Sequence, residues 1–161
     1  MGGSGILKDC ENFGMITIDG AEASSPIGGI NGFHSGGYAL QGCINEGDII
    51  ANVPVTGAGG FIGHMGNAEH KEGVIFGGRV KCAIKTPASP AGMICGNSAA
   101  TAKTTVFGTE ENPIAVAGTL TIGDTSVVMS AETVSDANLL LGSGATMYNP
   151  AYHIFYTNFA Q

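Results

Sequence analysis

Two glycine-rich motifs between residues 28 and 49 decide the fold: GGINGF at 28–33 and CINEGDI at 43–49. The first motif returns as GGFIGH at 59–64 and, more faintly, as AGMICG at 91–96, at offsets of 31 and 32 residues. A motif that recurs at a fixed spacing of this size indicates a repeat architecture.

The second motif recurs with a similar period. Its counterparts are CENFGMI at 10–16, VIFGGRV at 74–80 and TTVFG at 104–108. The glycines of the four copies, at positions 14, 47, 78 and 108, are separated by 33, 31 and 30 residues. Glycine richness alone does not produce two motifs that shift together, so the chain contains internal repeats.

Each repeat contains about three segments of strand length, for example 29–33, 39–44 and 48–53, separated by turn residues. Short runs of Ile, Val and Phe broken by Gly, Pro and Asn favour strands over helices. We therefore predict an all-β fold, a right-handed parallel β-solenoid of about three rungs. An antiparallel β-barrel or sandwich is the alternative.

Stacked rungs place equivalent residues one above another. The alignment predicts two interior ladders, Ile16–Ile49–Val80 and Ile30–Phe61–Met93, and one glycine ladder, Gly14–Gly47–Gly78. Replacing Ile49 by Asp is expected to unfold the first half of the chain. Its neighbour Asp48 faces outward and is expected to tolerate substitution.

The repeats resemble a known family. The pattern Gly-Gly-apolar-x-Gly, a polar stretch and then Cys-x-Asn-x-Gly-x-Ile, as in 28–49, is similar to the GLUG-type glycine-rich repeats of bacterial surface and secreted proteins. The resemblance covers roughly residues 5 to 98. In the third copy Ala91 stands for the first glycine and Cys95 for a later one. The resemblance implies a β-solenoid used for spacing, adhesion or scaffolding, and it transfers no catalytic residue.

Composition narrows the function. The 161 residues correspond to one domain, and 6 basic against 13 acidic side chains give a net charge of -7. This balance disfavours nucleic acid and anionic membranes as partners. Since no apolar run approaches the ~18 residues of a membrane span, membrane insertion is not expected. The opening 1–5 looks like a start followed by a flexible linker, so a missing signal peptide says little about the compartment.

The C-terminal part is expected to lose the repeat period from about Pro113. A hairpin is predicted from strand-like runs at 114–122 and 127–129 around a Gly-Asp turn, and a short helix at 130–141. The domain then divides into a start at 1–5, a repeat region at 6–112 and a capping or assembly segment at 113–161. The last residues are rich in aromatics, which we assign to a cap or assembly interface: Tyr148, Tyr152, Phe155, Tyr156 and Phe159.

The four histidines are the candidates for metal binding or acid–base chemistry: His34, His64, His70 and His153. His34 and His64 lie one repeat apart and would approach each other on neighbouring rungs. Their glycine-flanked positions are more typical of ordinary turn histidines. Glu69-His70 does not make the His-Glu-x-x-His motif of zinc proteases. No metal or catalytic site is therefore predicted here.

The four cysteines lack the spacing of a zinc site: Cys10, Cys43, Cys82 and Cys95. Cys10 and Cys43 occupy the same slot of neighbouring units, where parallel side-chain vectors disfavour a disulfide and favour stacked thiols. The sequence does not decide whether Cys82 and Cys95 form a disulfide.

Acidic residues gather in the first two units and would form a solvated face or a weak calcium site at Glu46 and Asp48. They are Asp9, Glu11, Asp19, Glu22, Glu46 and Asp48. An acidic cluster of this kind also occurs in carbohydrate-active enzymes, but the chain has no Trp to bind a sugar. No Gly-Lys-Ser/Thr phosphate loop is present. We therefore expect no enzyme and no cofactor.

The sequence favours a structural or adhesive module of a surface protein or extracellular assembly, acting through protein–protein contacts. Its partner would be another copy or a parent assembly, with carbohydrate as a further candidate. The expected location is extracellular or the cell surface. A virion decoration or fibre protein, and a carbohydrate-active enzyme on a β-helix scaffold, are the alternatives.

Overall fold

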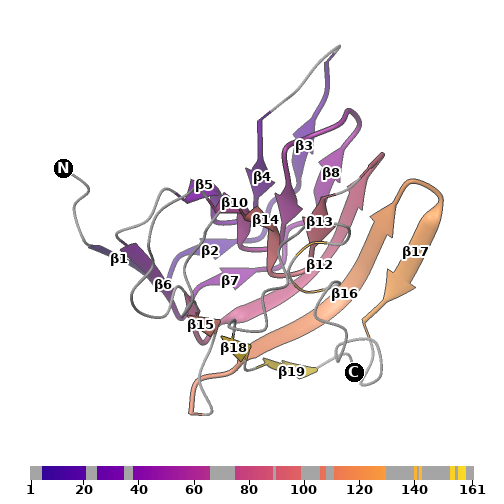
Figure 1. Ribbon diagram of the computed structural model, residues 1–161. Helices are drawn as coiled ribbons and strands as arrows, with labels where there is room; N and C mark the ends of the chain where they lie inside the picture. Colours follow the sequence, from indigo (N-terminus) through magenta and orange to yellow (C-terminus); the bar gives the residue numbers. More distant parts are fainter. Residues whose placement is uncertain are drawn as a thin grey trace.

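The structure, a computed structural model, describes residues 5–20, 25–34, 38–65, 75–88, 90–98, 106–107, 111–129, 140, 142, 153–154 and 156–158. The elements assigned within these ranges are all β-strands (Figure 1). The predicted all-β class is confirmed.

The chain runs through four sheets in a recurring order, which defines successive repeats. The first repeat (5–34) contains β1 (Gly5–Lys8), β2 (Glu11–Asn12), β3 (Ile16–Ile18), β4 (Ile27–Gly28) and β5 (Asn31–His34). The second (38–65) contains β6 (Tyr38–Gln41), β7 (Ile44–Asn45), β8 (Ile49–Ala51), β9 (Ala58–Gly59) and β10 (Ile62–Met65). The third (75–98) contains β11 (Ile75–Phe76), β12 (Arg79–Thr86), β13 (Ala91–Gly92) and β14 (Cys95–Ser98).

Five more strands follow. They are β15 (Val106–Phe107), β16 (Ile114–Ile122), β17 (Thr125–Val128), β18 (His153–Ile154) and β19 (Tyr156–Asn158). The predicted hairpin is confirmed, because β16 and β17 pair antiparallel around Gly123, whose φ is +58°. The predicted helix at 130–141 lies outside the described residues except for Leu140, which is helical and fully buried.

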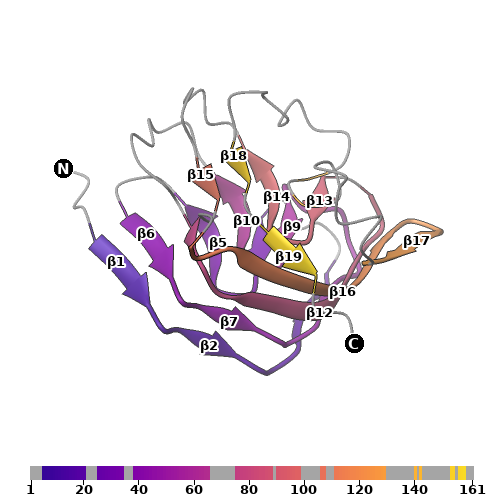
Figure 2. The same cartoon turned by 90° about the horizontal axis from the view of Figure 1, so that it is seen from below.

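Equivalent strands of successive repeats pair with one another in parallel. Sheet A has the order β1-β6-β11-β15-β18, sheet C the order β13-β9-β4 and sheet D the order β14-β10-β5. Sheet B contains β2-β7-β12-β16 with β3 and β8 alongside, and carries the antiparallel β17 and the parallel β19 on β16. In Figure 2 these strands lie side by side, repeat beside repeat. Apart from β17 the pairing is parallel, which is not that of an antiparallel barrel or sandwich.

The prediction that the period ends near Pro113 is wrong for 114–122. β16 pairs in parallel with the whole of β12, from Arg79 opposite Ala115 to Thr86 opposite Ile122. Stacking therefore continues into a fourth strand of sheet B. This fourth stacked strand was not recognised in the sequence, because 114–122 keeps the strand alternation but lacks the Asn-x-Gly motif of the earlier copies.

The interior ladder of sheet B differs from the predicted one. Ile16 pairs with Ile49 as predicted, but Ile49 pairs with Ile84 and not with Val80. Val80 instead lies opposite Asn45. In the predicted glycine ladder, Gly14 and Gly47 do stack. Gly78 does not join them, because the register of β12 places it opposite Cys43. The offset between neighbours grows from 33 residues to 35, which the glycine alignment missed.

The inward positions of sheet B explain its shape. In β12 the buried residues alternate with outward ones, so every second side chain faces the core. These inward slots read Cys-Asn-Gly-Ile in the first two repeats, at 10, 12, 14 and 16 and at 43, 45, 47 and 49. In the third repeat they read Gly-Val-Cys-Ile, and there the two short strands fuse into one long strand, β12. The Asn-x-Gly pair thus bends the sheet in the first two repeats.

Glycines allow sheets C and D to meet backbone against backbone. A Cβ on Gly28 would lie 2.6 Å from the nitrogen of Gly63 and 2.9 Å from the oxygen of Phe61. A Cβ on Gly59 would lie 2.6 Å from the nitrogen of Gly96. No larger residue fits at these corners.

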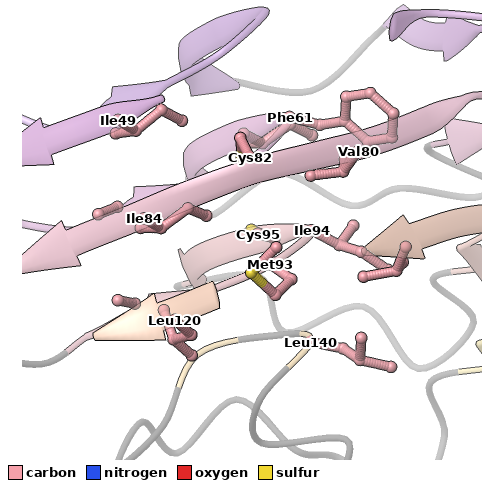
Figure 3. Close-up of a cluster of buried hydrophobic side chains, with 14 of the residues drawn as sticks. Ile49, Phe61, Val80, Cys82, Ile84, Met93, Ile94, Cys95, Leu120 and Leu140 are labelled. Carbon is pink, nitrogen blue, oxygen red and sulfur yellow. The ribbon is translucent and has the colours of Figure 1, made fainter. Parts of the chain in front are cut away.

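The ladder Ile30–Phe61–Met93 is correct only for its first two residues. Ile30 donates its N–H to the oxygen of Phe61, and Phe61 donates to the oxygen of Ile94. The sequence alignment was shifted by one residue in the third copy, because Gly92, and not Ala91, lies opposite Gly59. The core between the sheets is continuous, with Ile49, Ile84 and Leu120 following one another on neighbouring strands (Figure 3).

Candidate functional site

The first repeat exposes several large apolar side chains, more than the later repeats do among the side chains that the structure describes. Within the described residues, the large apolar side chains that are most exposed are Ile6 (64%), Leu7 (36%), Phe13 (59%), Met15 (69%), Phe33 (51%) and Val128 (65%). All but Val128 belong to the first repeat. We call these five first-repeat side chains the apolar belt.

The interior slots of the first repeat are also partly open. Leu7 is 36% exposed, whereas its partner Leu40 in the second repeat is 0% exposed. Ile16 is half-buried and its partner Ile49 is fully buried. The difference arises because, among the strands that the structure describes, each first-repeat strand, β1 to β5, has a partner on one side only. Figure 2 shows β1 and β2 along the outer margin of the stack.

The opposite end of sheet B is covered by the chain itself. Along the outer edge of β16, residues 114–116 pair with β19, Gly118 accepts a hydrogen bond from the nitrogen of Met129, and residues 119–122 pair with β17. Ile94, between sheets C and D, donates its N–H to the oxygen of Leu140. Within the described residues, sheet B is therefore covered at its β16 edge and uncovered at the edges of β2 and β3.

The predicted approach of His34 and His64 is wrong. The register pairs His34 with Met65 and His64 with Phe33, so the two histidines are one residue out of step and point to opposite faces of sheet D. His34 is fully buried, whereas His64 lies on the outer face, stacked on Phe33 with ring centroids 5.4 Å apart. Partial burial lowers the pKa of His64. The side chains of His70 and His153 lie outside what the structure describes.

The four cysteines are free thiols. Cys10 and Cys43 share one slot, as predicted, and the Cys43 thiol donates to the oxygen of Leu7 at 3.4 Å. Burial raises the pKa of Cys43, and it raises the pKa values of Cys82 and Cys95 to about 12. Thiols with such pKa values stay protonated and unreactive at neutral pH. The Cys82–Cys95 disulfide, left open by the sequence, is not formed.

The acidic residues do not converge. Glu46 forms an ion pair with Arg79 at 2.7 Å, and Asp48 accepts a hydrogen bond from the nitrogen of Ala83 at 2.8 Å. Asp19 accepts one from the amide of Asn52 at 2.6 Å. Asp9 and Glu11 lie on the first repeat, and Glu22 is outside the described residues. In the described part of the chain, no three His, Cys, Asp or Glu side chains form a group that could hold a metal ion.

Most of the predicted aromatic interface lies outside the described residues: Tyr148, Tyr152, Phe155 and Phe159. Tyr156 begins β19, where its backbone pairs with Ile114. The tail therefore adds a strand to this chain's own sheet, in the position that a cap would take. Whether the aromatics also contact another molecule stays a prediction.

The apolar belt was not predicted from the sequence. The signal lay in the alternation, since Phe13 and Met15 fall between the inward residues Asn12, Gly14 and Ile16. This alternation is the signal from which exposed apolar side chains in the first repeat could have been predicted.

Comparisons with protein-family models, with curated proteins and with solved structures found no match. Among the residues that the structure describes, no helix is both long and apolar enough to cross a membrane.

Proposed function

We propose that this chain is a structural parallel β-solenoid module that works through protein–protein contacts and not through catalysis. The recurring order of sheets A to D and the parallel register between repeats support the solenoid. The likeness of 28–49 to GLUG-type repeats supports the same architecture and, with it, a place at the cell surface or outside the cell. A virion structural protein is a variant of this function.

The observation that carries the proposal is the open first repeat. Within the described residues, strand edges without a partner and exposed apolar side chains occur together there, and natural proteins cover or break such edges when nothing binds them. A terminal repeat of a solenoid that stays in solution alone usually has a polar outer surface. The first repeat instead has the features of a contact surface.

Carbohydrate binding is the second candidate, and one feature favours it. The exposed Phe33 ring stacks on His64, and Asn97 follows His64 in the next strand of sheet D. This row offers an aromatic face beside an amide, which are the groups that hold ligands in shallow polar sites.

Light scattering after size-exclusion chromatography, with negative-stain imaging, separates the two candidates. Closed oligomers or filaments support the structural module. A monomer whose melting temperature rises with a panel of polysaccharides, and falls back when Phe33 is replaced by Ala, supports carbohydrate binding and contradicts the first proposal.

A further inference from the structure

We propose that Cys10 and Cys43 form a binding site for a soft monovalent metal ion, copper(I), which binds between their two sulfur atoms. The site lies between the first and second repeats, where β2 and β7 run side by side (Figure 2). It goes beyond the proposed function, because it needs no protein partner and no free strand edge. The register of the two cysteines, the direction of their thiols and the spacing of the strands carry the inference.

The two cysteines are direct neighbours on adjacent rungs. β2 and β7 pair in parallel, with Glu11 opposite Ile44. The N–H of Ile44 donates to the oxygen of Cys10 at 2.9 Å, so the register extends one residue back and sets Cys10 beside Cys43. Both side chains face the core, since Cys43 is 1% exposed and Cys10 packs against the buried cluster. The two sulfurs therefore lie on the same face of one strand pair.

The two thiols also have equivalent contacts. The Cys10 thiol donates to the oxygen of Lys8, two residues earlier, at 3.7 Å. The Cys43 sulfur lies at the same distance, 3.7 Å, from the oxygen of Gln41, and 3.4 Å from that of Leu7 in the first repeat. Equivalent side-chain directions place the sulfurs about one strand spacing apart, ~4.8 Å. The contact with Leu7 draws the Cys43 sulfur towards the first repeat and shortens this separation.

This geometry suits an ion between the sulfurs better than a disulfide. A disulfide needs Cβ atoms about 3.8 Å apart and a torsion of about 90°, whereas these two side chains run parallel. A bond from a thiolate to a late transition-metal ion is about 2.3 Å long, so an ion midway between two sulfurs needs them about 4.6 Å apart. Thiolates are ligands that copper(I) prefers, and two of them in a line satisfy it. The site needs no third side chain, and the described residues supply none.

Binding replaces two protons by one ion. Burial raises the pKa of the Cys43 thiol most, and the charge of the neighbouring Cys10 raises it further. A thiolate without a cation is therefore unfavourable in this slot. Copper(I) forms one bond to each sulfur and both thiol protons pass to the solvent, with no change in oxidation state. Binding should weaken as the pH falls, because protons compete with the ion for the sulfurs.

The other two cysteines have no such neighbour. Cys82 lies between Gly47 and Gly118 in sheet B, and Cys95 lies opposite Ile62 in sheet D. The structure describes all four cysteines, and only the first two share a slot. They are therefore the pair that offers two sulfurs to one ion.

Titration of the reduced protein with copper(I), without oxygen and against a copper(I) chelator, tests the site. We expect native mass spectrometry to show one ion on each chain of 16.2 kDa, and X-ray absorption to show two sulfur ligands. The melting temperature of the wild type should rise with the ion, because the ion binds the folded pair. A wild type that binds no ion, or an ion with three or more sulfur ligands, contradicts the inference.

Three variants locate the bound ion. Cys10→Ser should lose the ion to the chelator. Cys10→Ser combined with Glu11→Cys should lose it as well, since this variant keeps four thiols but sets the new one at an exposed position on the opposite face of β2. Cys95→Ala, which removes a buried thiol outside the pair, should keep the ion. Thermal unfolding without metal shows that each variant is folded. An ion that stays in either Cys10→Ser variant, or that is lost from folded Cys95→Ala, overturns the assignment.

Discussion

The buried amide of Asn45 makes three hydrogen bonds at the bend of the second repeat. It accepts from the Nδ2 of Asn12 at 2.7 Å, and its own Nδ2 donates to the oxygen of Gly47 at 3.2 Å and to the Cys82 sulfur at 3.4 Å. A polar side chain that is 0% exposed is stable in the core only because these bonds are made. The same amide packs against Gly29, where a Cβ would collide with it.

Removing the Asn45 amide should destabilise the fold. We expect Asn45→Ala to lower the free energy of unfolding by about 1–3 kcal/mol, because it leaves buried partners unsatisfied and opens a small cavity. Asn52→Ala is the matched control, since Asn52 is exposed and bonds Asp19 at the surface; a loss under about 1 kcal/mol is expected there. Urea denaturation measures both. Equal losses would show that the Asn45 network does not stabilise the bend.

Two glycines of the same slot give a second residue-scale prediction. A Cβ on Gly47 would lie 2.6 Å from the Asn12 amide nitrogen and against the oxygen of Gly14, whereas a Cβ on Gly14 meets nothing closer than 3.8 Å. We expect Gly47→Ala to cost about 1–3 kcal/mol by overpacking and Gly14→Ala to be neutral or slightly stabilising. The melting temperatures of the two variants, measured by thermal unfolding, test this difference. If Gly14→Ala is the more harmful one, a further strand covers the first repeat.

The buried thiols predict how stability depends on pH. Burial raises the pKa values of Cys82 and Cys95 from 9.0 to about 12, so the folded state holds both protons more tightly than the unfolded state. Their contribution to the free energy of unfolding is complete below pH 9.0 and is lost as the pH rises towards 12. The expected slope is about 1.4 kcal/mol per pH unit for each thiol within this window. Urea denaturation across the window measures it, and Cys95→Ala should lower the slope by about 1.4 kcal/mol per pH unit. A flat profile would contradict the burial of these thiols.

At the scale of the element, the long strand β12 shows how a bend in one repeat is matched to a straight strand in the next. β7 and β8 cover the two ends of β12, and the bend between them leaves the N–H of Ala83 without a strand partner. The Asp48 carboxylate accepts that N–H at 2.8 Å. Asp48 is exposed, as predicted, and whether it tolerates substitution stays a prediction, which this hydrogen bond makes less favourable.

We expect Asp48→Ala to lower the free energy of unfolding by about 1 kcal/mol, because the Ala83 N–H loses a charged acceptor. Asp48→Asn keeps an acceptor oxygen and should restore part of the loss. Glu11→Ala, at an exposed position of β2, should stay within about 0.5 kcal/mol of the wild type. The account of the bend fails if Asp48→Ala behaves like Glu11→Ala in urea denaturation.

The sequence predicted the elements better than their register. Strand-length runs and turn glycines locate β5, β8 and the β16–β17 hairpin, because alternation and turn chemistry are local. The single strand predicted at 39–44 is two strands, β6 and β7. The pairing of Ile49 with Ile84 is not local, and glycine is too common in this chain to align it. Gly78 was matched to Gly47 by residue type, although the inward slot opposite Gly47 is occupied by Cys82. The apolar belt was also missed, because the alternation shows that Phe13 and Met15 point outward but does not show how exposed they are.

At the scale of the whole molecule, the stack is asymmetric. The far edge of sheet B is covered by the hairpin and by β19, whereas, within the described residues, the first repeat leaves strand edges and apolar side chains exposed. The function proposed for the chain depends on this difference, because a stack with two closed ends would have no open edge to bind a partner. It also depends on the repeats lying one above another in the register described.

Methyl–methyl nuclear Overhauser effects in protein labelled at Ile, Leu and Val test that register most directly. Neighbouring parallel strands lie about 4.8 Å apart, so stacked methyl groups give strong signals. We expect contacts from Ile16 to Ile49, from Ile49 to Ile84 and from Ile84 to Leu120. A spectrum in which Ile49 contacts neither Ile16 nor Ile84 would contradict the parallel stack and the function argued from it.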